Sequence, residues 1–70
     1  MLRTPVACKV VAAVGYEDAS NILEIEFHSG KIFQYSQVPR EVYERFLGAR
    51  SKGRFFHHYV RDRYPHKHIR

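Results

Sequence analysis

The sequence predicts a small α+β domain in which a three-stranded antiparallel sheet is followed by two short helices packed on one of its faces (β-β-β-α-α). Two patterns support this fold class. The N-terminal half contains valine-rich or alternating apolar segments typical of strands, and the C-terminal half repeats aromatic residues at helical spacing. Because a domain usually contains about 100–200 residues, the 70 residues of this chain form a single domain, 1–70. Its core is predicted over residues 6–65, and a basic tail, residues 66–70, is expected to fray.

The first predicted strand covers residues 6–16, where four valines and the absence of proline favour extended backbone. Alternate residues of this segment are all apolar and form the expected core face: Val6, Cys8, Val10, Ala12, Val14 and Tyr16. Gly15 marks either a bulge or a close approach of another backbone segment. The polar residues 17–21 then end the strand.

The second and third predicted strands form a hairpin. Residues 22–27 alternate with a period of two, which predicts a half-exposed strand, and residues 31–35 return after a turn. A two-residue turn would place the aromatic residues of the returning strand on the polar side. A three-residue loop pairs Phe27 with Lys31 and needs a positive φ only at Gly30. We favour this loop because it gathers the apolar side chains on one face. They are Leu23, Ile25, Phe27, Phe33 and Tyr35.

Two helices are predicted to cover that face. The first begins at Pro39, which suits a first helical turn, and closes at Gly48. Its apolar residues are Val42, Tyr43, Phe46 and Leu47. Ser51 is the expected N-cap of the second helix, which Pro65 ends. Its apolar residues are Phe55, Phe56, Tyr59 and Val60.

Positive charge is concentrated at the C-terminal end of the chain. The formal net charge is +5, but residues 1–49 hold five basic and six acidic residues, whereas residues 50–70 hold seven basic residues and one acidic residue. In the second helix, the basic side chains fall on the face opposite the apolar one. Clustered cations attract phosphate backbones; the alternative is a solvated helix face that keeps the protein soluble. The candidate nucleic-acid-binding residues are Arg50, Lys52, Arg54, His57, His58, Arg61 and Arg63.

The order and spacing of several short motifs resemble the KTSC domain. These motifs are Val14-Gly15-Tyr16, residues 23–27, Ser29-Gly30, Phe33-Gln34-Tyr35, Val38-Pro39, residues 51–56 and Tyr64-Pro65. The resemblance covers about residues 6–65, and it implies a fold more strongly than a function. The family is named for a domain at the C-terminus of some lysyl-tRNA synthetases, and it also occurs as free-standing bacterial or phage proteins. RNA binding has been suggested from that association. The family's central Tyr-x-Tyr is Phe33-Gln34-Tyr35 here, which keeps both rings and loses one hydroxyl.

Aromatic, histidine and cysteine residues are further candidates for a functional site. Phe33 and Tyr35 are possible stacking residues for nucleobases, although the favoured register predicts their burial beneath the helices. Neighbouring His57 and His58 point about 100° apart on a helix, and the only thiol, Cys8, lies on a distant strand. We therefore expect no metal and no cofactor. No spacing suggests a nucleophile with a base and an orienting group, so an enzyme is not expected.

These observations predict a non-enzymatic binding domain of the cytoplasm, because no segment has the apolar length of a signal peptide or a membrane span. The first hypothesis is that it binds RNA or another single-stranded nucleic acid through the basic C-terminal helix. The alternative is a protein–protein interaction module whose partner is unknown. No membrane partner is expected, because the apolar helix face is committed to the core. The chain is expected to be a monomer or a weak dimer formed by an exposed edge strand.

Overall fold

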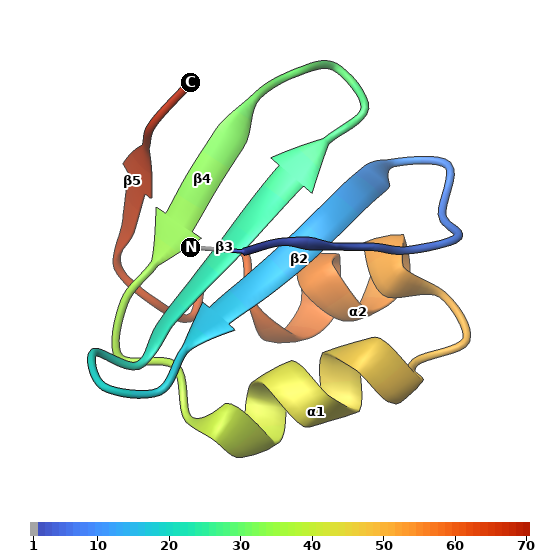
Figure 1. Cartoon of the computed structure of the whole chain (residues 1–70). Coiled ribbons are helices and arrows are strands. Elements are labelled where there is room, and N and C mark those ends of the chain that lie inside the picture. Colours follow the sequence, from blue (N-terminus) through green and yellow to red (C-terminus); the bar gives the residue numbers. More distant parts are fainter. Residues whose placement is uncertain (1) are drawn as a thin grey trace.

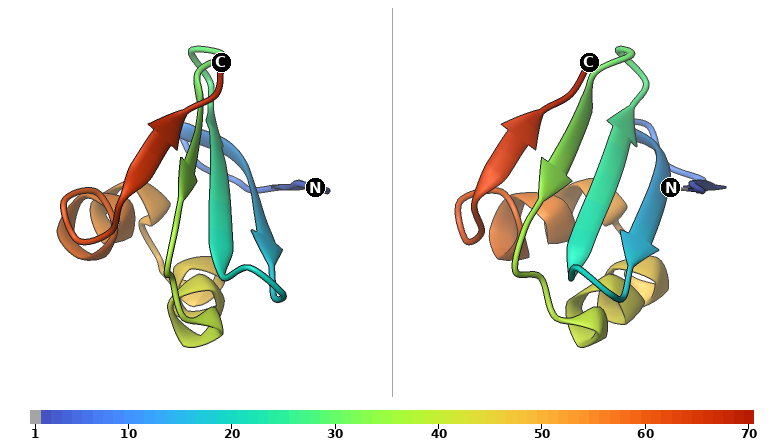
Figure 2. Two further views of the ribbon diagram at one scale, coloured as in Figure 1. Left: turned by 90° about the vertical axis from the view of Figure 1, so that its left-hand side faces the viewer. Right: turned by 60° about the vertical axis from the view of Figure 1, so that its left-hand side comes forward.

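The structure, a computed structural model, describes residues 2–70, so Met1 of the predicted domain lies outside the described residues. The elements in chain order are β1 (Thr4–Pro5), β2 (Val11–Glu17), β3 (Ile22–Phe27), β4 (Ile32–Tyr35), α1 (Arg40–Gly48), α2 (Lys52–Tyr59) and β5 (His66–His68). The strands form one antiparallel sheet in the order β1-β2-β3-β4-β5. Both helices lie on one side of it (Figures 1 and 2). The α+β class is confirmed, but the predicted three strands are wrong: there are five, four before the helices and one after them.

The first predicted strand, residues 6–16, is interrupted. The ladder with β3 begins only at Val11, and the residues before it lead back to the short strand β1. A bulge at Ala12 shifts the register, and an extra residue in one strand reverses the alternation of faces on either side of it. Consequently Val11 and Val14 are both fully buried, whereas Val10, which was predicted in the core, is 54% exposed. The bulge lies at Ala12 rather than at Gly15.

The hairpin between β3 and β4 has the favoured three-residue loop. The Phe27 N–H donates to the Lys31 carbonyl at 2.9 Å, and the Gly30 N–H donates to the Phe27 carbonyl at 2.9 Å. Gly30 has φ +94°, the left-handed conformation that this loop requires. Ile25 therefore stands opposite Phe33, and the apolar side chains of both strands face the helices as predicted.

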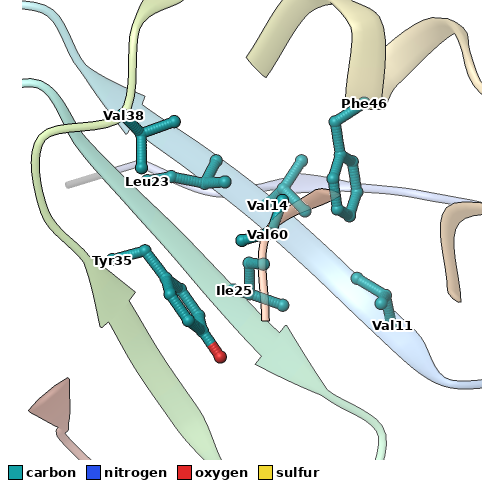
Figure 3. Close-up of a cluster of buried hydrophobic side chains, with 8 residues drawn as sticks. All are labelled: Val11, Val14, Leu23, Ile25, Tyr35, Val38, Phe46 and Val60. Carbon is teal, nitrogen blue, oxygen red and sulfur yellow. The ribbon is translucent and has the colours of Figure 1, made fainter. Parts of the chain in front are cut away.

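The hydrophobic core lies between the sheet and the two helices (Figure 3). Its buried members come from both layers: Val11, Val14, Leu23, Ile25, Tyr35, Val38, Phe46 and Val60. The helix N-cap predicted at Ser51 is confirmed, since its hydroxyl accepts a hydrogen bond from the Arg54 N–H at 3.2 Å. However, α2 ends at Tyr59 rather than near Pro65. The Phe56 carbonyl accepts the N–H groups of both residues 60 and 61, at 3.0 and 2.9 Å, and this shared acceptor closes the helix.

The N-terminal segment crosses the face of the sheet away from the helices (Figures 1 and 2). From this segment Arg3 forms ion pairs with Glu24 and with Glu26, the latter at 3.2 Å between Nε and Oε1. Gln34 donates to Glu24 at 2.8 Å. Glu24 is therefore only 5% exposed, and the predicted exposure of this side of β3 is wrong at that position. Burial raises the pKa of Glu24, but the hydrogen bonds from Gln34 and Arg3 and the charge of Arg3 outweigh it and hold the pKa below its ordinary value.

The predicted fraying of the basic tail is wrong, because residues 66–68 form strand β5 beside β4. The His68 ring stacks on the Phe33 ring with centroids 4.5 Å apart and planes 3° apart. Beyond the strand, the Ile69 N–H donates to the Ile32 carbonyl at 2.8 Å, and the Ile32 N–H donates to the Arg70 carbonyl at 2.5 Å. Ring stacking and backbone pairing together offset the entropy of ordering these five residues.

Candidate nucleic-acid interface

The basic side chains of α2 and the turn after it project into solvent. All the predicted nucleic-acid-binding residues except Lys52 are exposed: Arg50, Arg54, His57, His58, Arg61 and Arg63. Within residues 2–70, none of them forms an ion pair with a carboxylate. Arg3 and Arg40, by contrast, form ion pairs with carboxylates. Arg40 pairs with Asp18 at 2.6 Å and with Glu44 at 3.2 Å. Six of the seven predicted cations are thus available to an outside anion, although Lys9, Lys31 and Arg45 are also exposed and unpaired among residues 2–70.

Lys52 has a different place from the other predicted basic residues. Its side chain is half-buried, and its Nζ donates to the Ala49 carbonyl at 2.9 Å, just beyond the end of α1. A cation at this position satisfies a carbonyl that the helix leaves free. Lys52 therefore stabilises the junction between the helices, and its charge is less available to a ligand than that of Arg54.

Arg61 lies beyond the end of α2 but stays on its basic face. One guanidinium nitrogen of Arg61 lies 3.5 Å from Nδ1 of His57, four residues earlier. The predicted spacing therefore holds although the helix itself is shorter than predicted. Arg54 and His58 border a hollow of about 280 Å³ together with Arg50 and the ring of Tyr59. The basic surface thus continues from the N-terminal end of α2 to the turn after it.

The N-terminal end of α2 faces the segment before β2. Cys8, Arg50 and Lys52 line a hollow of about 410 Å³ between them. The thiol of Cys8 accepts a hydrogen bond from the Val11 N–H at 3.5 Å. Burial raises the pKa of Cys8, but nearby backbone N–H groups, including that of Gly53 in α2, and the charge of Lys52 outweigh it and leave the pKa below its ordinary value.

A third recess joins the two sets of residues singled out in the sequence. It is a cleft of about 380 Å³ between α2, the turn after it and the strands β3 to β5. Its lining residues are Phe27, Phe33, Tyr35, Phe56, Arg61, Asp62 and His66. The predicted stacking pair and one predicted phosphate ligand therefore share a single cavity. This proximity was not predicted, because it depends on β5 and on the turn after α2.

Neither member of the predicted stacking pair is an open platform. One face of Phe33 carries the ring of His68. Tyr35 is 4% exposed, and its ring packs edge-on against Phe56 with centroids 5.6 Å apart. The predicted burial of Tyr35 is confirmed, whereas Phe33 is only half-buried.

The described residues offer neither a cluster of metal ligands nor a helix that could span a membrane. From Leu2 to Arg70, no three His, Cys, Asp or Glu side chains converge in a way that could hold a metal ion. The expectation that the protein uses no metal stays a prediction. No helix in that same range combines the length and the apolar character needed to cross a membrane.

The chain is similar to several known proteins. The family model of the KTSC domain matches residues 8–64. A protein of Tsukamurella paurometabola is 38% identical over 60 residues, which cover 86% of this chain and 90% of that protein. A lysine–tRNA ligase of a Nostoc species is 34% identical over 59 residues; this match covers 84% of the chain but only 10% of the ligase. The crystal structure of a KTSC domain protein from Yersinia pestis matches with a TM-score of 0.96 and 32% identity, over 99% of this chain and 97% of that one.

Proposed function

Because the chain belongs to the KTSC domain family, we propose that it binds single-stranded RNA through the phosphates of the RNA backbone, by a non-enzymatic mechanism. The contacts come from the exposed cations of α2 and the turn after it. The observation that carries the proposal is the row of solvent-exposed arginine and histidine side chains without carboxylate partners among residues 2–70. Guanidinium groups that are not already paired retain their full attraction for phosphate.

The distribution of charge supports an anionic polymer as the partner. Residues 50–70 hold seven of the twelve basic residues and one of the seven acidic residues. In the rest of the described chain, Arg3 and Arg40 are held by carboxylates, and the unpaired cations Lys9, Lys31 and Arg45 are spread over a loop, a hairpin and α1 rather than gathered on one element. A charge arranged on one face steers a polyanion to that face and sets its orientation.

The relatives supply a second argument. Segments similar to this chain occur within lysine–tRNA ligases, where they make up 10% of the whole protein. The name of those enzymes states that they act on a tRNA, so the homologous segment belongs to an RNA-binding protein. We propose the same kind of ligand, an RNA, for the present chain, with the cytoplasm as its expected location. A shared fold alone does not imply a shared function. The exposed arginines of this chain supply the residues that would contact the RNA.

The proposal is tested by fluorescence anisotropy of a labelled single-stranded RNA of mixed sequence. At about 50 mM salt we expect binding whose log–log salt slope has a magnitude of about 2–3.5, the value for three to five neutralised phosphates in a single strand. The double variant Arg54→Glu/Arg61→Glu removes most of the affinity. Lys31→Glu in the β3–β4 hairpin reverses one charge away from α2 and is the matched control for the single variant Arg54→Glu.

Three outcomes would contradict the proposal. They are no binding at low salt, binding that does not depend on salt, and equal losses in the α2 variant and the hairpin control. Capture of one defined protein at high salt, without RNA binding, would favour the alternative function, a protein–protein interaction module. Sedimentation of the same samples shows whether the chain acts as a monomer or as a weak dimer.

A further inference from the structure

We propose that the cleft between α2 and strands β4 and β5 receives one nucleobase of the bound strand, while Arg61 at the rim of the cleft contacts the phosphate next to it. This inference rests on the proposed function and assigns a specific pocket to it. In this cleft, aromatic walls meet the guanidinium group of Arg61.

The walls of the cleft suit a flat aromatic ligand. Phe27 packs edge-on against both Phe33 and Phe56, with ring centroids 6.0 and 5.4 Å apart. Tyr35 packs edge-on against Phe56 at 5.6 Å, and the His66 ring lies 5.6 Å from the Tyr35 ring. These rings hold one another in fixed orientations, so the cavity is formed before a ligand arrives. Bases bind to such apolar aromatic surfaces by stacking and by edge contacts.

One polar group of the cleft lacks a partner. Tyr35 is 4% exposed, yet no hydrogen bond to its hydroxyl is present within residues 2–70. Figure 3 shows that the hydroxyl points away from the aliphatic core residues Leu23 and Val38, and Tyr35 lines the cleft. No buried side-chain nitrogen or oxygen atom of the described residues lacks a hydrogen-bond partner, so the unpaired hydroxyl is accessible from the cleft and is free to donate to a ligand atom there.

The charges near that hydroxyl match a nucleotide. Burial raises the pKa of Tyr35, the positive charge of Arg61 lowers it, and the negative charge of Asp62 raises it. The hydroxyl therefore stays protonated at neutral pH and donates a hydrogen bond to a ring nitrogen or carbonyl of a base. The carboxylate of Asp62 accepts hydrogen bonds from base N–H groups, and the guanidinium of Arg61 takes the phosphate.

The size of the cleft agrees with this ligand. Its volume of about 380 Å³ lies at the lower end of the range of about 300–1,000 Å³ found for small-ligand sites. The pocket therefore has room for one nucleotide unit, and Arg61, which lines it, belongs to the basic surface of α2 and the turn after it.

The test is a titration of the full chain with adenosine 5′-monophosphate, followed by amide chemical shifts in two-dimensional NMR. Ribose 5-phosphate, which lacks the base, is the control ligand. We expect the nucleotide to shift amides around Phe33, Phe56 and His66, and the control to shift only those near Arg61. Tyr35→Phe keeps the ring and removes only the hydroxyl, so it weakens nucleotide binding about two- to tenfold, the effect of one hydrogen bond. Its melting temperature should stay near that of the unmodified chain, because the hydroxyl has no partner in the fold.

Arg54→Gln separates this inference from the proposed function. Arg54 lies on α2 outside the cleft, so its loss weakens RNA binding and leaves nucleotide binding unchanged. Equal shifts with nucleotide and ribose 5-phosphate, or an unchanged affinity in Tyr35→Phe, would refute the base pocket even if RNA binds with the expected salt dependence. Nucleotide binding without any RNA binding would instead overturn the proposed function and leave the pocket.

Discussion

Gly15 lies under the N-terminal segment, and replacing it with alanine tests how that segment is held. The φ of Gly15 is not positive, so alanine fits the backbone and only space decides the outcome. A Cβ built at this position would lie 2.4 Å from the carbonyl oxygen of Leu2, whereas ordinary contacts begin at 3.4 Å. The obstacle is backbone rather than the end of a side chain. The N-terminal segment must therefore move outward by about 1 Å.

The expected cost follows from two opposing effects. Forcing an extra methyl group into a filled space typically costs about 1–3 kcal/mol, and the movement also strains the ion pair of Arg3 with the buried Glu24. A Gly→Ala change returns about 0.4–1 kcal/mol by restricting the unfolded chain. We therefore expect Gly15→Ala to lower the free energy of unfolding by about 1–2 kcal/mol. Each kcal/mol lowers the melting temperature of a domain of this size by about 4–8 °C.

The assay is urea unfolding at neutral pH, in the full chain and in a variant that begins at Thr4. Without residues 1–3 the obstacle at Leu2 is absent, so Gly15→Ala should be neutral or slightly stabilising there, and the two changes should not be additive. A Gly15→Ala protein as stable as the unmodified full chain would refute the close approach. An equal loss in the full and the shortened chain would show that the space is closed by something else.

Two further predictions concern buried charge and the C-terminal strand. Because the pKa of Glu24 is lowered in the fold, its contribution to the free energy of unfolding is present above the ordinary pKa of 4.5 and is lost as the pH falls below that value. Glu24→Gln should therefore make the free energy of unfolding depend less on pH in the acid range. Urea unfolding measured across pH 2–7 tests this. A Glu24→Gln protein with the same acid dependence as the unmodified chain would contradict this. His68→Ala removes the ring stacked on Phe33, which should lower the free energy of unfolding by about 0.5–1.5 kcal/mol. It should also speed amide exchange in β5 more than in β3. An equal increase of the exchange rate in both strands would contradict the role of the stack.

The sequence predicted the parts of the fold that local patterns determine. The three-residue loop at Gly30 was predictable because only one residue needs a positive φ and because one register alone gathers the apolar side chains. The N-cap at Ser51 was predictable from residue type and position alone. Both features depend on residues close together in the chain.

The features that were predicted wrongly depend instead on contacts between residues that are far apart in the chain. The bulge at Ala12 has no local signal in a run of small apolar residues, and it reversed the predicted faces of Val10 and Val11. Strand β5 is short and basic, so its composition suggested a frayed tail. Its order comes from His68 stacking on Phe33 and from pairing with β4, which no pattern within residues 66–70 shows.

In the candidate interface, too, local features were predictable and those that depend on distant contacts were not. Exposure of the basic face of α2 follows from helical spacing, and the prediction named its members. The structural role of Lys52 was missed, because it depends on the carbonyl of Ala49 at the end of the other helix. The cleft was missed because three of its lining residues, Phe56, Asp62 and His66, are brought to Tyr35 only by the tertiary fold.

Strand β5 connects stability to the proposed site. His66 lines the cleft, and it is positioned opposite Tyr35 by the ladder between β4 and β5. His68, two residues later, lies on the same side of the strand and anchors it on Phe33. The side chain that stabilises the strand and the side chain that lines the cleft therefore share one short segment. Loosening β5 would open the cleft on one side while leaving the exposed arginine of α2, Arg54, in place, so binding of a base and binding of phosphates should respond differently to the same change.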